Sequence, residues 1–268
     1  MDTAPAAERH APGTRAGPAP GYQNDPDYRI VLVPCAKRIR ASFAGHTVFD
    51  IQNAVVMCET GHIALYYVPR DDADMTLMNL TDHSTLCPFK GHTSYYTLRA
   101  DGREAENAVW SYEAPYDEAA AISGWLAFYW NQLDRWYEED EEVFIHARDP
   151  HVRIDIVESH RPVEVIAGGE TIARTTRARF LFETGDRPRY YIPREDVAAA
   201  ALFPSELRTG YPYKGTASYH HIAAGGVTIE DVVWYYPEPV DEVRRIGGYL
   251  CFYPERVGTI LVDGKPAP

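Results

Sequence analysis

The feature of this sequence that most constrains its fold is an internal repeat. Compared with itself at an offset of 124 residues, the chain matches without a gap from about Gly45 to Tyr129. The matches include Glu59-Thr60-Gly61 with Glu183-Thr184-Gly185, Tyr66-Tyr67-Val68-Pro69-Arg70 with Tyr190-Tyr191-Ile192-Pro193-Arg194, Pro88-Phe89-Lys90-Gly91 with Pro212-Tyr213-Lys214-Gly215, and Val109-Trp110 with Val233-Trp234. Because the offset never slips, the two copies must share their loop lengths and therefore their fold.

The repeat sets the domain organisation of the 268 residues. Residues 1–26 are rich in Ala and Pro with almost no large apolar side chain, which predicts a flexible tail. The acidic run at 138–142 and the Arg-Asp-Pro that follows it mark the junction between the copies. We therefore place the first domain at 27–147 and the second at 148–268.

Both copies are expected to form short antiparallel strands. Apolar and polar residues alternate in segments separated by glycine or proline turns, which is typical of small β domains. In the second copy these segments are 161–166, 170–174, 179–183, 217–222 and 227–234.

Helical structure is expected to be short. The stretch from Asp117 has the pattern of an amphipathic helix, but its repeat contains Gly247-Gly248 and Pro254, which would break a helix interior. We predict a helical turn at 117–121 and 241–245, each followed by a strand. One short helix per copy is predicted after the Tyr-x-Pro-Arg motif, around residues 72–79 and 197–202.

The order of these motifs resembles a bacterial family known as domain of unknown function 427, in a tandem two-copy form. The resemblance rests on Tyr-Tyr-x-Pro-Arg-x-Asp, Cys-Pro-Phe-Lys-Gly, Val-Trp-x-Tyr-x-x-Pro and Gly-x-x-x-Phe-Tyr, and it covers nearly all of residues 29–265. It implies a mainly β, β-tent fold of the Mss4-like class. Many relatives in that class hold zinc with two CxxC pairs, which this sequence lacks, so a structural zinc is not carried over.

Net charge and cysteine content limit the partners. The formal charge is −13, and residues 26–147 hold 19 acidic against 9 basic residues. A field of this sign repels phosphate backbones and anionic membranes, so we expect neither nucleic acid nor membrane as a partner. The four cysteines form no CxxC pair, and no long apolar window occurs, which favours a cytoplasmic protein. No nucleotide-binding motif is present, so no cofactor is expected.

Lys90 and Lys214 are the first candidates for chemistry, since both copies keep a lysine inside Pro-x-Lys-Gly. A lysine held by this turn can point into a pocket and bind a carboxylate or phosphate, or form a Schiff base if it is desolvated. The alternative is a lysine in a surface turn. We favour the inward role.

Cys87 is a second candidate, because Lys90 and a nearby imidazole would activate a thiol. His83 and His92 flank it and could complete a metal site with it. The alternative is a small buried side chain that opens a turn. The second copy has Tyr211 in place of Cys87, so this chemistry is confined to the first copy, and we assign no metal.

The remaining candidates are aromatic residues, arginines and a histidine. Aromatic rings could line a ligand pocket, although such residues more often pack in the core. Arg70 and Arg194 could bind a ligand carboxylate, but pairing with Asp72 and Asp196 is favoured. His221 is expected to share the strand face of Tyr219 and could act as a base, with a surface position as the alternative. The aromatic candidates are Tyr67, Tyr95, Trp110, Tyr112, Tyr191, Tyr219, Trp234 and Tyr236.

Three functions are consistent with these residues. The first is an enzyme of unspecified reaction that acts on a polar or anionic metabolite in an aromatic pocket containing Lys and Arg. The second is a non-catalytic module that binds a ligand or partner. The third is a thiol-dependent redox enzyme that uses Cys87. No motif indicates a substrate or an oligomeric state.

Overall fold

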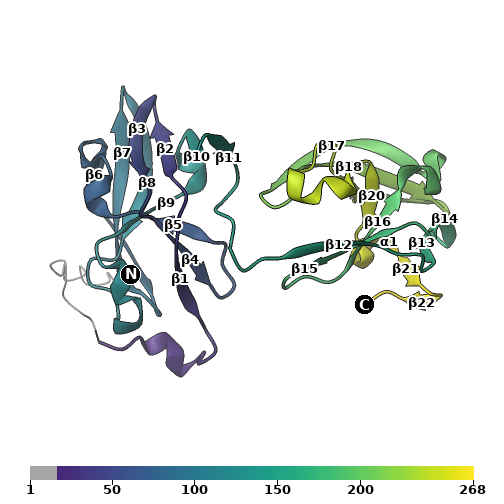
Figure 1. Cartoon of the computed structure of the whole chain (residues 1–268), viewed down its shortest axis with the longest axis horizontal. Coiled ribbons are helices and arrows are strands. Elements are labelled where there is room, and N and C mark those ends of the chain that lie inside the picture. Colours follow the sequence, from purple (N-terminus) through teal and green to yellow (C-terminus); the bar gives the residue numbers. More distant parts are fainter. Residues whose placement is uncertain (1–16) are drawn as a thin grey trace, which may run out of the picture. The chain divides into compact units, whose positions relative to one another are not determined.

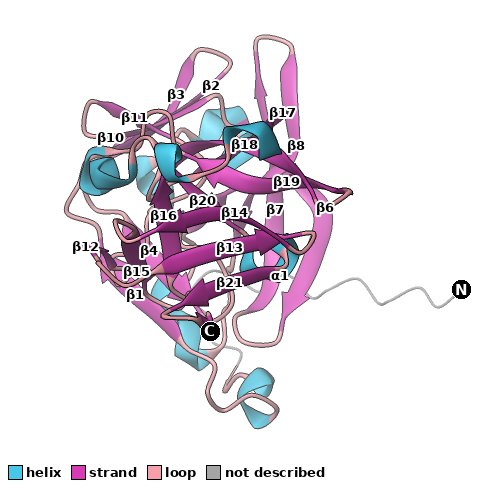
Figure 2. Ribbon diagram, turned by 90° about the vertical axis from the view of Figure 1, so that its right-hand side faces the viewer, coloured by secondary structure: helices cyan, strands magenta, loops and turns pink. Residues whose placement is uncertain are grey.

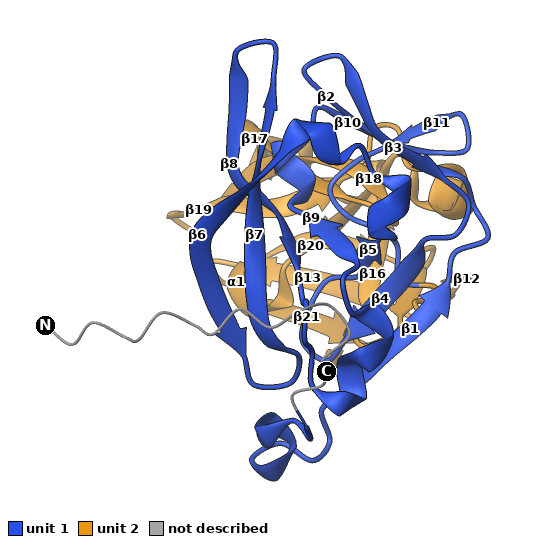
Figure 3. Ribbon diagram, turned by 90° about the vertical axis from the view of Figure 1, so that its left-hand side faces the viewer, with its two compact units in different colours: residues 1–149 blue, residues 150–268 orange. Residues whose placement is uncertain are grey.

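The computed structural model describes residues 17–268. The chain divides into two compact units, Met1–Asp149 (unit 1) and Pro150–Pro268 (unit 2), two residues after the boundary placed at residue 147 (Figure 3). Strands make up most of both units (Figure 2), and their pairings are antiparallel. The prediction of a mainly β protein with two repeated antiparallel domains is confirmed.

Unit 1 contains three sheets in its described residues, 17–149 (Figure 1). Their strand orders are β1-β4-β5, β11-β10-β2-β3 and β6-β7-β8-β9. Two hydrogen bonds between Val68 and Leu126, at 2.9 and 2.8 Å, continue the first sheet into the third. The strands are β1 (Ile30–Pro34), β2 (Ile39–Phe43), β3 (His46–Ile51), β4 (Val55–Glu59), β5 (Leu65–Tyr67), β6 (Met78–Cys87), β7 (Gly91–Ala100), β8 (Arg103–Ser111), β9 (Leu126–Phe128), β10 (Arg135–Glu138) and β11 (Glu141–Val143).

Unit 2 contains two sheets, with orders β12-β15-β16-β20-β19-β18-β17 and β14-β13-β21-β22. The strands are β12 (Ile154–Glu158), β13 (Val163–Ala167), β14 (Glu170–Thr175), β15 (Arg179–Glu183), β16 (Arg189–Pro193), β17 (Leu202–Tyr211), β18 (Gly215–Ala224), β19 (Val227–Tyr235), β20 (Tyr249–Phe252), β21 (Thr259–Val262) and β22 (Lys265–Pro266). Ten of the eleven corresponding strands begin 124 residues apart, and only β9 and β20 differ, by one residue. The sequence repeat is therefore a repeat of the fold.

The helices of the described residues are short, with three to six residues each. A turn of α-helix, α1 (Pro254–Val257), occurs in unit 2. The 3-10 helices are Pro20–Gln23, Arg70–Asp72, Met75–Leu77, Asp117–Ile122 and Trp130–Gln132 in unit 1, and Arg194–Asp196, Ala199–Ala201 and Asp241–Ile246 in unit 2. The turns predicted from residues 117 and 241 are confirmed, as are the strands that follow them.

The single helix predicted after Tyr-x-Pro-Arg is instead a pair of 3-10 turns in each unit. In unit 1 the first turn ends at Asp72, and the second is capped by Asp74, whose carboxylate accepts a hydrogen bond from the Thr76 N–H at 3.0 Å. The chain is already extended at Asn79, which pairs with Thr97 of β7. The pairing of β6 with β7 begins at Met78, within the residues predicted as helix, and holds this part of the chain extended.

Part of the expected tail is attached to unit 1. Residues 1–16 lie outside the described residues, but the 3-10 helix Pro20–Gln23 is held by a 2.9 Å hydrogen bond from the Gly21 N–H to the Pro88 carbonyl. Ala19 is 5% exposed, and its N–H donates to Glu118 at 2.9 Å. The flexible-tail prediction is therefore wrong for residues 17–26, because backbone groups of unit 1 bind this segment.

Each unit has two apolar clusters, one on either face of its central strands. Neighbouring side chains alternate between them, as a strand requires: Tyr66 packs in one cluster of unit 1 and Tyr67 in the other. The second cluster, here called the aromatic cluster, contains most of the predicted aromatic residues. It comprises Met57, Tyr67, Tyr95, Trp110, Tyr112, Ala119, Ile122 and Ala127 in unit 1, and Leu181, Tyr191, Ala217, Tyr219, Trp234, Tyr236, Val243, Ile246 and Cys251 in unit 2.

The glycine that follows the repeated lysine should be essential for the turn. Gly215 has φ +101°, and a Cβ there would lie 3.1 Å from the Glu238 carbonyl oxygen. We expect Gly215→Ala to lower the free energy of unfolding by about 1–3 kcal/mol. Gly226→Ala is the control, since Gly226 also has a positive φ but nothing within 4 Å, and its loss should be the smaller. If urea denaturation showed equal losses of stability for Gly215→Ala and Gly226→Ala, the close contact with the Glu238 carbonyl would not matter for the turn.

Candidate functional site

A cleft of about 570 Å³ opens beside the aromatic cluster of unit 1. Its volume lies within the usual range for small-molecule sites, roughly 300–1,000 Å³. Most of its lining is aromatic or aliphatic, with four polar side chains among them. The lining residues are Glu59, His62, Ile63, Leu65, Tyr67, Lys90, Tyr95, Trp110, Tyr112, Phe128, Tyr129, Trp130, Asn131 and Ile145.

An ion pair between Glu59 and Lys90 is the most buried polar feature of the cleft. Only 5% of the Glu59 side chain and 10% of the Lys90 side chain are exposed, and the ammonium donates to both carboxylate oxygens. Tyr28 adds a third donor, its hydroxyl lying 2.5 Å from Glu59 Oε1. Desolvation of these charges is costly, and it is offset here by saturating the carboxylate with hydrogen bonds.

The Glu-Thr-Gly motif fixes the position of Glu59 at the end of β4. The Thr60 N–H donates to the Arg29 carbonyl at 3.0 Å, and the Thr60 hydroxyl oxygen accepts the Arg29 N–H at 2.9 Å. Gly61 then adopts φ +73°, and the following N–H of His62 returns to the Glu59 carbonyl at 3.0 Å. The motif is therefore a turn that ties the end of β4 to the start of β1.

The Pro-x-Lys-Gly motif fixes Lys90 in the turn between β6 and β7. Gly91 has φ +107°, a conformation that side chains other than glycine rarely adopt. The Lys90 carbonyl accepts a hydrogen bond from the Tyr116 N–H at 3.1 Å, which anchors the turn. The lysine points inward, as we favoured from the sequence, but its charge is already paired with Glu59.

Tyrosine and tryptophan rings form the walls around this pair. Tyr67 is 1% exposed, and it is hydrogen-bonded to the Trp110 indole. Burial raises the pKa of Tyr67 well above its ordinary value, so its phenol stays neutral. Lys90 Nζ lies 5.9 Å from the centre of the Tyr112 ring. Tyr95 completes the predicted set, and all four aromatic residues predicted in unit 1 line the cleft.

Unit 2 repeats the ion pair. Lys214 is bonded to Glu183, with 8% and 4% of the two side chains exposed. Tyr211 donates to Glu183 Oε1 at 2.6 Å. The aromatic residues predicted in this unit surround the pair in its aromatic cluster, where Tyr191, Tyr219, Trp234 and Tyr236 are all at most 7% exposed.

An arginine covers the aromatic cluster of unit 2. The Arg189 guanidinium lies 5.6 Å from the centre of the Trp234 ring and is bridged to Asp186 at 3.1 Å and to Glu255 at 3.8 Å. The corresponding positions in unit 1 are Leu65, His62 and Asn131, which line the open cleft. The two copies thus share the ion pair but differ in what lies over it.

Arg70 is not part of the cleft. Its guanidinium pairs with Glu113 and donates to the Tyr96 hydroxyl at 2.8 Å. Asp72, the partner we favoured, instead accepts a hydrogen bond from Asn53 at 2.8 Å. The Asp72 prediction is therefore wrong, because the turn after Pro69 directs the arginine toward the end of β8.

Arg194 also differs from the prediction. It lies 3.3 Å from His220 Nε2 and stacks 4.9 Å from the centre of the Tyr235 ring, while Asp196 is bound by Arg177. Burial, together with the Arg194 charge, lowers the pKa of His220, so the imidazole is neutral at pH 7 and can accept this hydrogen bond.

His221 supports the backbone rather than facing the aromatic cluster. Side chains alternate along β18, with Tyr219 in the aromatic cluster and Ile222 in the cluster on the other face. His221 therefore lies on the strand face of Tyr219, at a position outside the aromatic cluster. His221 Nδ1 accepts a hydrogen bond at 3.0 Å from the N–H of Asp231, which has φ +49°. In unit 1 the Thr97 hydroxyl holds the equivalent N–H of Asn107 in the same way, at 3.2 Å.

Cys87 lies against the aromatic cluster of unit 1 but does not line the cleft. His83 packs on Tyr95, with ring centres 4.5 Å apart. Within residues 17–268, the ligand atoms of His83, Cys87 and His92 are not gathered within 4.8 Å of one another. The metal site considered from the sequence is therefore not assembled.

Glu59, Glu183 and Tyr28 are functional residues that were not predicted from the sequence. The two glutamates had a detectable signal, since Glu-Thr-Gly recurs at the same offset as the lysines. Tyr28 had no such signal in the sequence, because it precedes β1 and the corresponding position of the second copy is Val152.

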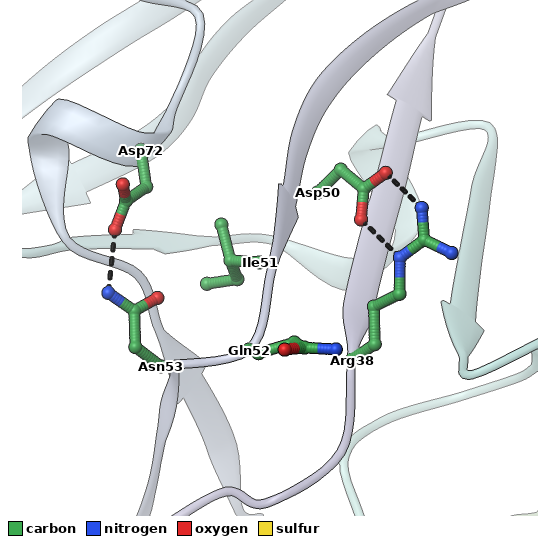
Figure 4. A pocket seen from close by; sticks show the side chains of 6 residues that line it. All are labelled: Arg38, Asp50, Ile51, Gln52, Asn53 and Asp72. Carbon is green, nitrogen blue, oxygen red and sulfur yellow. Dashed lines mark hydrogen bonds and ion pairs between the residues drawn. The ribbon is translucent and has the colours of Figure 1, made fainter.

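A second depression in unit 1 is polar and shallow (Figure 4). Arg38 binds both oxygens of Asp50, at 2.6 and 2.5 Å, and Asn53 binds Asp72. Its charged side chains are thus paired or hydrogen-bonded at the surface, and the aromatic cleft remains the candidate site.

The fold and the cleft define a tandem antiparallel β protein in which each copy holds a buried glutamate–lysine pair. A family model described as domain of unknown function 427 (DUF427) matches residues 31–139 and 155–263. The chain belongs to this family, with two copies of its domain. No curated protein matches the chain. Among the described residues, no helix combines the length and apolar character needed to span a membrane.

Breaking the Glu59–Lys90 pair should destabilise unit 1. Lys90→Met leaves a buried carboxylate without its counter-ion, and we expect a loss of about 3 kcal/mol in the free energy of unfolding. Glu59→Leu/Lys90→Met should recover much of this loss. Four of the five tryptophans lie in unit 1, so tryptophan fluorescence during urea denaturation reports mainly on this unit. Lys37→Met, at a lysine of unit 1 whose side chain is 51% exposed, is the control. A Lys90→Met protein as stable as the control would contradict the account.

Stability should fall at alkaline pH because two thiols are buried. Burial raises the pKa of Cys251 to about 12, and burial with the neighbouring Asp149 raises that of Cys58 to about 12. In the unfolded chain these thiols ionise near pH 8.5. Stability is therefore fully present below about pH 8.5 and is lost as the pH rises toward 12, by up to about 1.4 kcal/mol per pH unit for each thiol. In urea denaturation at pH 7.5–10.5, Cys251→Ala should show a shallower decline, and an unchanged slope would contradict this assignment.

Proposed function

We propose that unit 1 binds a small molecule with a flat aromatic or heteroaromatic body and a polar end group. The observation that carries this proposal is the buried Glu59–Lys90 pair at an open cleft whose other walls are mainly aromatic. Rings of Trp110, Tyr129 and Trp130 favour a flat ligand through stacking and apolar contact. The polar end lies against Glu59 and Lys90.

The charge of the site indicates the type of polar group. Because Glu59 neutralises Lys90 directly, a lone anion gains less there than at an unpaired lysine. A group that both donates and accepts hydrogen bonds, such as a carboxamide or an amino acid end, complements an ammonium beside a carboxylate. This narrows the polar or anionic metabolite expected from the sequence.

An enzymatic role is the second candidate. Its support is that the Glu59 carboxylate and the Lys90 ammonium are in contact in the cleft. A bound ligand would exclude water there, and the two charged groups would then act more strongly on the ligand. In this role Glu59 and Lys90 exchange protons with the polar end of the ligand. A non-catalytic module would use the same contacts for binding alone. Thiol chemistry at Cys87 remains a hypothesis from the sequence, since that residue does not line the cleft.

The cellular setting belongs to the same proposal. The net charge of −13 favours a small molecule over nucleic acid or an anionic membrane as partner. The cysteine pattern favours a reducing compartment such as the cytoplasm.

Unit 2 provides the design for a test of the cleft. The triple variant His62→Asp/Leu65→Arg/Asn131→Glu transplants the three residues that lie over the aromatic cluster of unit 2. We expect it to fold and to bind a ligand at least tenfold more weakly, because an arginine would occupy the space beside Trp110. The measurement is a thermal-shift screen of aromatic amides, heteroaromatic bases and aromatic amino acids, followed by calorimetry on the compounds that bind.

Leu86→Arg is the matched control, since Leu86 is 57% exposed and lies outside the cleft. It adds a charge to unit 1 without filling the cleft and should bind as the wild type does. Equal affinities in the wild type and the triple variant would exclude the cleft as the site. Product analysis on each bound compound separates the candidates: turnover lost in Glu59→Gln supports the enzyme, and binding without turnover supports the module.

A further inference from the structure

The two ion pairs receive their tyrosine from different parts of the chain. In unit 2, Glu183 is bound by Tyr211, the last residue of β17, at 2.6 Å. In unit 1, Glu59 is bound at 2.5 Å by Tyr28, which precedes β1. Both hydroxyls donate to Oε1 of the glutamate. The same hydrogen bond is thus made by residues that do not correspond in the repeat.

The exchange follows from one residue difference. The position of Tyr211 is occupied in unit 1 by Cys87, whose short side chain cannot reach the glutamate as a phenol does. The Tyr28 ring lies beside this position and stacks on Phe89, with ring centres 3.6 Å apart and an angle of 4° between planes. In unit 2, Tyr211 contacts Tyr213, the counterpart of Phe89, in a tilted arrangement, with ring centres 5.3 Å apart and an angle of 49° between planes.

The segment that carries Tyr28 is fitted to unit 1. Gly21 packs so closely on Phe89 that a Cβ at this position would lie 2.6 Å from the ring. Tyr22 contacts the same ring edge-on, with centres 5.2 Å apart. The Asp117 N–H donates to the Gly17 carbonyl at 2.9 Å. Backbone and ring contacts therefore hold residues 17–28 on the turn that carries Lys90.

We propose that residues 17–28, here called the N-terminal strap, are a part of the unit 1 site, and that Tyr28 is its positioning residue. The strap lies outside the family domain, which begins at residue 31. It supplies to unit 1 the phenol that Tyr211 supplies to unit 2. The inference rests on the proposed function only in that Glu59 is taken to contact the ligand.

The phenol has two effects on the pair. Burial, together with the hydrogen bond to Glu59, raises the pKa of Tyr28, so the hydroxyl remains a donor throughout the neutral range. Its ring is 7% exposed and separates Glu59 from solvent on the side of the strap. Without it, Glu59 loses one of its donors, and water and small reagents reach Lys90 from that side.

The test uses the reactivity of Lys90, which requires no ligand. The full-length protein is acetylated with limiting acetic anhydride, and the rates at Lys90 and Lys214 are compared by peptide mass spectrometry. Tyr28→Phe keeps the ring and removes the hydroxyl, and Tyr28→Ala removes both. We expect about tenfold faster labelling of Lys90 in Tyr28→Ala and a smaller increase in Tyr28→Phe. Lys214, whose glutamate keeps Tyr211, is the internal control and should be unchanged.

Rescue distinguishes positioning from a general loss of structure. Cys87→Tyr in the Tyr28→Ala background recreates the arrangement of unit 2, and we expect it to return Lys90 labelling to near the wild-type rate. Tyr22→Ala, which removes a strap ring that does not touch Glu59, should have a smaller effect than Tyr28→Ala. Unchanged labelling of Lys90 in both Tyr28 variants, or no rescue by Cys87→Tyr, would overturn the proposal. Should Tyr28→Ala not fold, Tyr28→Phe still decides it.

The outcome is separable from that of the ligand screen. Labelling that follows the prediction while no compound binds the wild type would retain the strap and refute the ligand site. If a compound such as nicotinamide binds, Tyr28→Phe should weaken its binding, and Cys87→Tyr should restore it in the Tyr28→Ala background. Binding without any change in labelling would retain the cleft and refute the strap.

Discussion

Both units are organised around a glutamate and a lysine that are buried together. Burying either charge without its partner would be costly. Each unit must therefore position the end of one strand accurately against the turn between two other strands. Glu-Thr-Gly and Pro-x-Lys-Gly are the two devices that achieve this, the first by tying β4 to β1 and the second by a glycine at φ above +100°. The aromatic residues then surround the pair and exclude solvent from it.

Identical scaffolds support different surfaces in the two copies. In unit 2 an arginine lies over the aromatic cluster and is neutralised by two acidic residues, so the space beside Trp234 is filled. In unit 1 the same positions are a leucine, a histidine and an asparagine, and a cleft results. The two copies thus keep one architecture and differ in the side chains that lie over the polar pair.

The sequence predicted the fold well because its signals were repeated. Strand positions, the turns at 117 and 241, and the inward lysines followed from patterns that recur at a constant offset. The errors occurred where a local pattern was overruled by pairing between strands. The helix after Tyr-x-Pro-Arg gave way to two 3-10 turns and the long hairpin of β6 and β7. Arg70 was assigned to a neighbour in sequence, whereas the fold offered Glu113 from the loop that follows β8.

The sequence by itself determined that the chain is one domain written twice, and which aromatic and lysine side chains both copies retain. Only the tertiary structure decided which carboxylate meets each lysine, which copy remains open, and that Tyr28 from outside the repeat takes the place of Tyr211. The physical reason is that repetition identifies what two copies share, whereas an ion pair and a cleft depend on side chains far apart in sequence. A contact made by only one copy leaves no trace in the comparison of the two.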